Sequence, residues 1–142
     1  MKLVLNAFFC CAILSVFAQN TSLDVKHYSL QLAVNDANNN IQLNEKIRFV
    51  ALKNATEVRF DLTQTNEQHK GMFVKKVVQQ NKSVRFRQLP EQLMLEGLQL
   101  EEGLEYEFYF ELEGIPTDGL VIGKNKFNQR TFFGDKDRKS VV

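Results

Sequence analysis

The sequence predicts an all-β domain of antiparallel strands, arranged as a β-sandwich or an open barrel, and three observations support this prediction. Apolar and polar residues alternate in several short runs, which is the period of a strand with one buried face. Turn-forming residues recur roughly every 8 to 12 positions, and no segment keeps a helical period. The 12 phenylalanines suit the core of a sheet.

The first predicted strand covers residues 28–34, where Tyr28, Leu30 and Leu32 alternate with polar or small residues, so we expect it to be half-buried. Residues 36–40 predict a turn, because Asp and Asn tolerate left-handed backbone and bond to their own main chain. The alternation resumes at residues 41–49, and Glu45 interrupts it on the apolar face.

The middle of the chain predicts shorter elements. A turn at residues 53–56 leads to a third strand that carries Val58, Phe60 and Leu62. Residues 63–72 are polar and without period, which predicts a loop.

Residues 74–78 and 84–87 then predict a hairpin, and Leu93 and Leu95 a further short strand. Residues 101–103 predict a turn, and residues 105–112 alternate more regularly than any other segment. We expect that last strand to end at Gly114-Ile115-Pro116, because proline cannot donate to a ladder of hydrogen bonds.

Residues 1–18 predict a secretory signal peptide. Met1-Lys2 gives a positive start, an apolar run follows, and small residues precede a cleavage point before Gln19. A membrane anchor is the rival interpretation, but the apolar run is shorter than the about 20 residues that a span needs. A lipoprotein signal is disfavoured because Phe8 and Phe9 precede Cys10. We therefore expect export, to the periplasm, the cell surface or the medium, with no membrane span after cleavage.

Charge and cysteine content exclude several classes of function. Without Lys2, the 18 basic residues become 17 and equal the 17 acidic ones, so nothing indicates a nucleic-acid partner. Cys10 and Cys11 leave with the signal peptide. A disulfide scaffold, a thiol nucleophile and a cysteine metal site are thereby excluded.

Catalytic residues are scarce. His27 and His69 are the two histidines, neither belongs to an H-E-x-x-H helix, and no G-x-S-x-G motif occurs. We interpret both histidines as solvated. Neighbouring acidic and basic residues are likewise interpreted as a solvated turn or strand face rather than a glycosidase pair or a nucleic-acid site. These residues are Glu101, Glu102, Glu105, Glu107, Glu111, Arg85 and Arg87.

The segments 114–127 and 130–135 carry the most specific signal. They read GIPTDGLVIGKNKF and RTFFGD. This run resembles secreted bacterial members of the aminopeptidase N family, the gluzincin zinc exopeptidases. Residues 28–34 and 47–52 also resemble the first domain of that family, and the resemblance covers about residues 24–135.

The resemblance implies a saddle-shaped β domain that packs on a thermolysin-like catalytic domain and helps to wall its active site. In the full-length enzyme, zinc-bound water deprotonated by a glutamate would hydrolyse an N-terminal peptide bond. The zinc ligands, the catalytic glutamate and the Gly-x-Met-Glu-Asn motif lie further along the family sequence. No catalytic, cofactor-binding or metal-ligating residue is therefore carried over to this chain.

The resemblance stops after Asp135. Relatives continue with a Trp-Pro-containing stretch, whereas residues 136–142 read KDRKSVV. A frameshift, a premature stop or a split gene would explain this divergent tail.

We thus expect three parts: a signal peptide (1–18), an aminopeptidase N-like N-terminal β domain (19–135) and the tail (136–142). The partner would be the missing catalytic domain, in cis or from a split gene, and a peptide substrate would bind only to the full-length enzyme. The alternative is a free-standing secreted β-sandwich that binds a protein or glycan through aromatics such as Tyr109 or Phe127.

Overall fold

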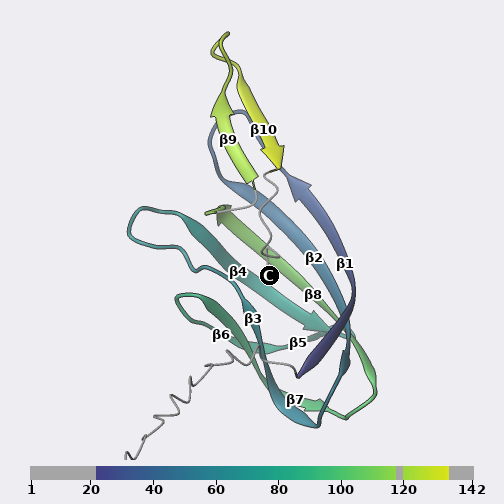
Figure 1. Cartoon of the computed structure of the whole chain (residues 1–142). Helices are drawn as coiled ribbons and strands as arrows, with labels where there is room; N and C mark the ends of the chain where they lie inside the picture. The colour runs from purple at the N-terminus through teal and green to yellow at the C-terminus, as the bar shows by residue number, and fades with distance from the viewer. Residues whose placement is uncertain (1–21, 118–119, 135–142) are drawn as a thin grey trace, which may run out of the picture.

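The computed structural model describes residues 22–117 and 120–134, and these residues form antiparallel sheets that do not close into a barrel (Figure 1). The predicted all-β, sandwich-like fold class is therefore confirmed. The predicted signal peptide, the tail at 136–142, and residues 118, 119 and 135 of the family-like run lie outside the described residues.

Ten strands are described. In chain order they are β1 (Leu23–Ala33), β2 (Ile41–Ala51), β3 (Ala55–Asp61), β4 (Gly71–Gln79), β5 (Lys82–Ser83), β6 (Arg85–Gln88), β7 (Gln92–Leu100), β8 (Glu105–Ile115), β9 (Leu120–Lys124) and β10 (Arg130–Gly134). The large sheet has the order β1-β2-β8-β4-β5, and the two smaller sheets are β3-β7-β6 and β10-β9.

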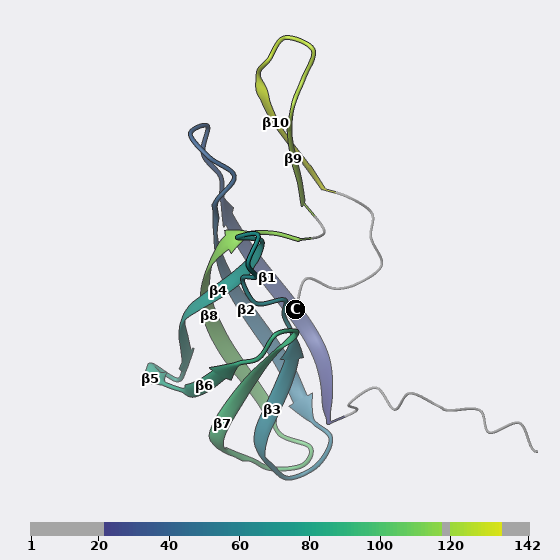
Figure 2. The same ribbon diagram turned by 90° about the vertical axis from the view of Figure 1, so that its left-hand side faces the viewer.

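The core lies between the large sheet and the β3-β7-β6 sheet (Figure 2). β2 and β8 sit inside the large sheet, and alternate residues of each are buried, as their sequence pattern predicts. Phe49 and Phe108 stack with ring centroids 5.6 Å apart, and Phe60 of the small sheet meets the Phe110 ring edge-on at 5.5 Å. Such aromatic pairs add to the free energy gained by burying their apolar area.

β1 begins at Leu23, earlier than predicted. A β-bulge shifts the alternation of its side chains, which is why the sequence pattern missed the first part of the strand. Val25 lies opposite Phe49, whereas His27 lies opposite Arg48, so one extra residue is inserted between them. The bulge keeps Leu23 and Val25 on the same side of the sheet as Tyr28. The period seen from residue 28 onward could not reveal this earlier part of the strand.

β4 includes Gly71 and Met72, which the sequence pattern assigned to a loop. A second bulge, between Val74 and Lys76, again changes the alternation. The predicted hairpin forms at its far end, where Gln80 and Asn81 both have positive φ (48° and 63°). Two such residues fit the twist of paired strands.

The returning arm of this hairpin is split, which corrects the prediction of one strand at 84–87. β5 pairs with β4 in the large sheet, whereas β6 pairs with β7 in the small sheet. β7 is also longer than predicted.

Gln88 joins the two sheets through its side-chain amide. Its Oε1 accepts a hydrogen bond from the backbone N–H of Val74 at 3.2 Å, and its Nε2 donates to the carbonyl of Met72. The side chain at the end of β6 thus takes the place of a neighbouring strand along part of β4.

Two glycines allow the paired strands β4 and β8 to approach closely where the large sheet ends. Gly114 has φ of +154°, and a Cβ built on it would lie 2.2 Å from the carbonyl oxygen of Gly71. Gly71 has φ of +122° and is similarly crowded by the backbone of Gln64. A side chain at either position would collide with backbone, which cannot swing away.

The β9-β10 hairpin projects from the end of the domain where β8 stops and the β1–β2 turn lies (Figure 2). Leu120 and Ile122 pack against the core, and Arg130 donates a hydrogen bond to the side chain of Asn39 in that turn. The alternation of apolar and polar residues did not predict this hairpin. The sequence marked these residues only through their resemblance to the aminopeptidase N family.

Candidate functional site

Both histidines are exposed, as predicted. His27 lies opposite Arg48 on β1, and His69 lies in the loop between β3 and β4 with φ of 60°. Within residues 22–117 and 120–134, no group of three or more His, Cys, Asp or Glu side chains could hold a metal ion. The described residues therefore do not fit a zinc ion, and no chemical step through zinc is assigned to them.

The predicted acidic strand face is part of a set of ion pairs across the outer side of the large sheet. The glutamates come from β8 and their basic partners from β2 and β4, at distances of 3.2–3.9 Å. The pairs are Arg48–Glu105, Lys46–Glu107, Lys76–Glu111 and Lys75–Glu113. Exposed pairs of this kind contribute little stability, at most about 1 kcal/mol each.

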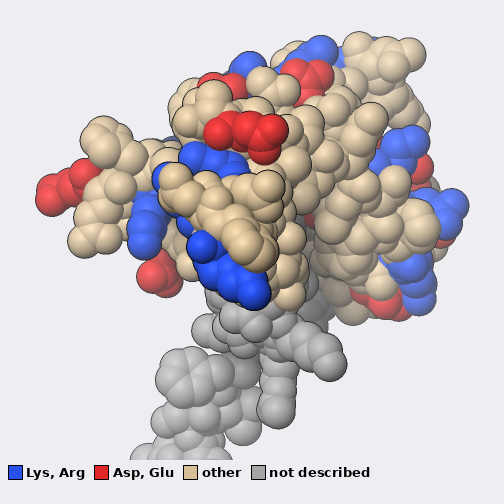
Figure 3. Space-filling view, turned by 90° about the horizontal axis from the view of Figure 1, so that it is seen from above, with Lys and Arg blue, Asp and Glu red and all other residues tan. Residues whose placement is uncertain are grey.

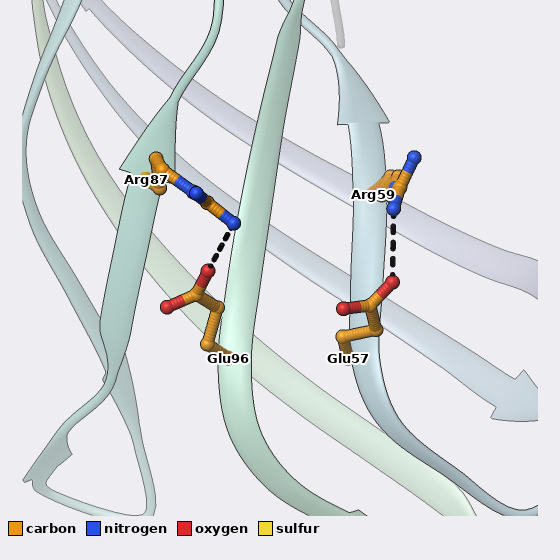
Figure 4. A network of polar contacts seen from close by, with 4 residues as sticks. All are labelled: Glu57, Arg59, Arg87 and Glu96. Carbon is orange, nitrogen blue, oxygen red and sulfur yellow. Dashed lines mark hydrogen bonds and ion pairs between the residues drawn. The ribbon is translucent and has the colours of Figure 1, made fainter.

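Arg85 and Arg87 are exposed on β6, and Arg87 pairs with Glu96 of β7 at 2.9 Å (Figure 4). On the other side of β7, Arg59 pairs with Glu57 at 3.0 Å. Met94 lies between Arg59 and Arg87 in register and is only 4% exposed. The arginine stems therefore flank an apolar residue on the outer face of the small sheet.

A cleft of about 590 Å³ opens beside β3, lined by Ser22, residues 53–59 and residues 99–101. The Oδ1 atom of Asn54 accepts a hydrogen bond from the N–H of Glu102 at 2.8 Å, which ties the two turns at this end together. In the wall of the cleft, Glu57 and Arg59 form an ion pair, so their opposite charges neutralise each other. Lys53, Glu101 and the hydroxyl of Ser22 also line the cleft, so it offers polar and charged contacts.

Glu45 is the one charged residue among the buried residues of the described chain. It is 2% exposed on the inward face of β2, and its Oε2 atom has no hydrogen-bond partner among the described residues. Burial raises the pKa of Glu45 from 4.5 to about 7. The break in the alternation of β2 marked this residue in the sequence, but only the packing shows that it is enclosed.

The apolar row on β1 is exposed, which corrects the prediction that this strand is half-buried. Tyr28, Leu30 and Leu32 are 40%, 57% and 46% exposed. The core reaches β1 only at Leu23 and Val25, so the later side chains of the row share the inward face of the large sheet yet remain in contact with solvent. The burial of a strand depends on what packs against it, and its period does not carry that information.

A second apolar area lies on the β9-β10 hairpin, where Val121 is paired in register with Phe133. These two side chains are 38% and 55% exposed, and Phe127 at the hairpin tip is 69% exposed. Tyr109, the other aromatic proposed as a contact, is half-buried. Exposed apolar surface often marks an interaction site, which makes this hairpin a candidate contact surface.

Seen from above, the charges of the domain are interspersed between uncharged areas, without a field of one sign (Figure 3). This distribution agrees with the balanced composition and offers no basic track for a nucleic-acid backbone on that face. In the part of the chain that the structure describes, no helix is long and apolar enough to cross a membrane.

No protein-family model matches the sequence, and no curated protein matches it either. Solved structures do match the fold. A two-domain M1 zinc metallopeptidase variant bound to L-tryptophan is similar with a TM-score of 0.59 and 20% identity, over 70% of this chain and 22% of that one. The M1 zinc metallopeptidase from Deinococcus radiodurans gives 0.58 and 20%, over 69% and 21%.

A variant of the Deinococcus radiodurans enzyme bound to a Tyr-Ser-Ala substrate gives a TM-score of 0.57 and 18% identity, over 73% of this chain and 22% of that one. At these identities the likeness establishes the fold. The chain thus shares its β fold with a part of M1 zinc metallopeptidases, and it spans about a fifth of their length.

Proposed function

We propose that this chain is the N-terminal β domain of an exported zinc-dependent aminopeptidase that removes N-terminal residues from peptides. The observation that carries the proposal is the match of about 70% of this chain to about 22% of M1 zinc metallopeptidase chains. The resemblance of residues 114–135 to secreted aminopeptidases supports the same assignment independently of the strand order.

In this proposal, the described residues position and cover a catalytic segment and do not perform the reaction. The outer face of the large sheet, with its ion pairs, suits solvent. The exposed side chains of the β9-β10 hairpin suit contact with another part of the enzyme. Zinc and its ligands would belong to that other part.

The proposal predicts a genetic and an enzymatic result. Resequencing the locus through and beyond codon 142 and translating the three forward frames would reveal an H-E-x-x-H motif followed by a distant glutamate. The encoded zinc segment, produced with this chain, would hydrolyse aminoacyl p-nitroanilides, and a chelator would stop the hydrolysis. Neither partner alone would do so at the same rate.

A confirmed stop codon with no peptidase-like sequence beyond it would contradict the proposal. The free-standing binding module would then be the better interpretation, and glycan and protein binding should be measured with a Phe127→Ala variant as the comparison.

Export is the second element of the proposal. If residues 1–18 are a signal peptide, mass spectrometry of the protein recovered outside the cytoplasm will show a chain that begins at Gln19. A chain that retains Met1 and remains in the cytoplasm would contradict this element and leave the fold assignment intact.

A further inference from the structure

The loop that closes the β9-β10 hairpin is fixed by its own hydrogen bonds. Within the tip, which we define as residues 124–130, the Oδ1 atom of Asn125 accepts hydrogen bonds from the N–H groups of Phe127 and Gln129 at 2.9 and 3.0 Å. The backbone N–H of Asn125 donates to the carbonyl of Gln129 at 2.9 Å, and Asn128 adopts the left-handed backbone, with φ of 64°. Asparagine suits both roles. The side chains of the tip are therefore held in place before any partner arrives.

Phe127 lies on this tip with its ring in solvent. It is 69% exposed, more than any other large hydrophobic residue of the described chain. The Nζ atom of Lys126 lies 4.9 Å from the centroid of that ring. The hairpin projects beyond the two packed sheets, so the tip is a protrusion of the domain (Figure 2). Transfer of such a ring from water to an apolar phase is favourable. The tip therefore offers one apolar anchor with a cation beside it.

The charge of the hairpin has the opposite sign to that of the rest of the domain. Residues 120–134 contain three basic residues and no acidic one, and the nearest aspartates in the sequence flank the ends of this range rather than the tip. Residues 22–117 contain 14 acidic and 11 basic residues. Of the three cations, Lys124 and Lys126 are exposed and Arg130 is half-buried. An anionic surface would therefore attract the tip and repel the rest of the domain, which selects one orientation of approach.

The shape of the tip distinguishes between anionic partners. A nucleic acid is bound along a basic track, and a protein interface centres on side chains that fill pockets of the partner. A single aromatic ring on a protrusion, with lysines around it, instead suits a soft surface that the ring can enter. The lysine stems can then lie along the apolar region while their ammonium groups stay among the headgroup phosphates. The anionic partner that this arrangement fits best is therefore a lipid bilayer.

We propose that the tip binds reversibly to bilayers that contain anionic phospholipids. Phe127 enters the headgroup region, and Lys124 and Lys126 contact the phosphates. The attachment is weak because it rests on one ring and few charges, much as a single acyl chain gives only marginal binding. This binding goes beyond the proposed peptidase role and does not depend on it. Val121 and Phe133 lie near the other end of the hairpin and stay available to another part of the enzyme.

The test is cosedimentation of the protein, purified as its host produces it, with lipid vesicles. The protein will bind vesicles of phosphatidylcholine mixed with phosphatidylglycerol, and it will not bind vesicles of phosphatidylcholine alone. Added salt will release it, because salt screens the attraction between exposed charges. Lys126→Gln will lower the partition coefficient about fivefold, since it removes one charge from the membrane surface. Phe127→Ser will lower the coefficient about tenfold, since it removes the apolar anchor. Both residues are exposed, so neither variant should disturb the fold.

Lys53→Gln and Leu52→Ser are the matched controls. These neighbours are likewise an exposed cation beside an exposed apolar side chain, but they follow the end of β2 at Ala51, at the opposite end of the domain from the hairpin (Figure 2). Both control variants will bind the mixed vesicles like the unaltered protein.

Three results with vesicles would each overturn the proposal: no binding to the mixed vesicles, equal binding to the two kinds of vesicle, or equal effects of the tip variants and the control variants. Binding to immobilised polyglutamate without binding to vesicles would also overturn it, because the tip would then recognise an anionic polymer.

Discussion

Leu30 of β1 lies directly opposite Glu45 of β2, and the two side chains share one face of the large sheet although their environments differ sharply. Leu30 is 57% exposed, whereas Glu45 is 2% exposed. The hydrophobic side chain thus meets solvent, while the ionisable one is enclosed beside Phe110, which is its partner on β8. This inversion has consequences for stability that can be measured.

Stability should fall as the pH rises from about 4.5 to 7. The folded-state pKa of Glu45 is raised to about 7, so in this interval the unfolded chain loses its proton and the folded chain keeps it. Glu45→Leu should abolish this slope and increase the free energy of unfolding at pH 8 by about 3 kcal/mol. Urea unfolding at several pH values measures both effects.

The control for this experiment is Glu107→Gln, because Glu107 is 52% exposed and pairs with Lys46 on the surface. Its effect should stay within about 1 kcal/mol at every pH. A pH slope between 4.5 and 7 that persists in Glu45→Leu would show that another group is responsible.

Gly114→Ala should destabilise the domain strongly. The new Cβ would lie 2.2 Å from the carbonyl oxygen of Gly71, at a φ that L residues rarely adopt. Backbone strain alone should cost about 1–3 kcal/mol. Gly123→Ala provides the comparison, because nothing lies within 4 Å of its built Cβ. Equal thermal midpoints for the two variants would contradict the close approach of β4 and β8 at Gly114.

Phe108→Ala should cost about 3–5 kcal/mol in the free energy of unfolding, because it leaves a cavity beside the stacked ring of Phe49. Phe108 is 0% exposed. Phe73→Ala removes the same ring from an outward position on β4 that is 53% exposed, and its effect should stay within about 0.5 kcal/mol. Denaturant unfolding of both variants would test whether the core lies where the structure places it.

Gln88→Ala should cost about 1–3 kcal/mol, because it leaves the partly buried N–H of Val74 and the carbonyl of Met72 without their partner. Gln99→Ala, which changes an exposed glutamine on β7, should have little effect. Hydrogen exchange adds a local measurement, since the amide of Val74 should lose protection in the first variant only. Unchanged protection at Val74 would mean that the side-chain bridge does not form.

Much of the fold could be predicted because it follows from local pattern. β2 and β8 alternate along their whole length and lie inside the sheet, so period and burial agree. The turn at 36–40 follows from asparagine side chains that bond to nearby backbone, as the Oδ1 of Asn35 does with the N–H of Ala37 at 2.9 Å. The break at Glu45 was also visible in the sequence, and it falls on the buried face as the period requires.

The rest was decided by contacts between distant segments. The bulges after Val25 and Val74 shift the alternation, so a search for a strict period misses the beginnings of β1 and β4. The division of residues 82–88 between two sheets depends on which neighbour each strand finds, and no local signal contains that choice. The sequence by itself determined the strand period and the apolar face of each main strand. Only the tertiary structure decided which of those faces is covered, because the small sheet packs over β2 and β8 and leaves Leu30 on β1 exposed while it encloses Glu45.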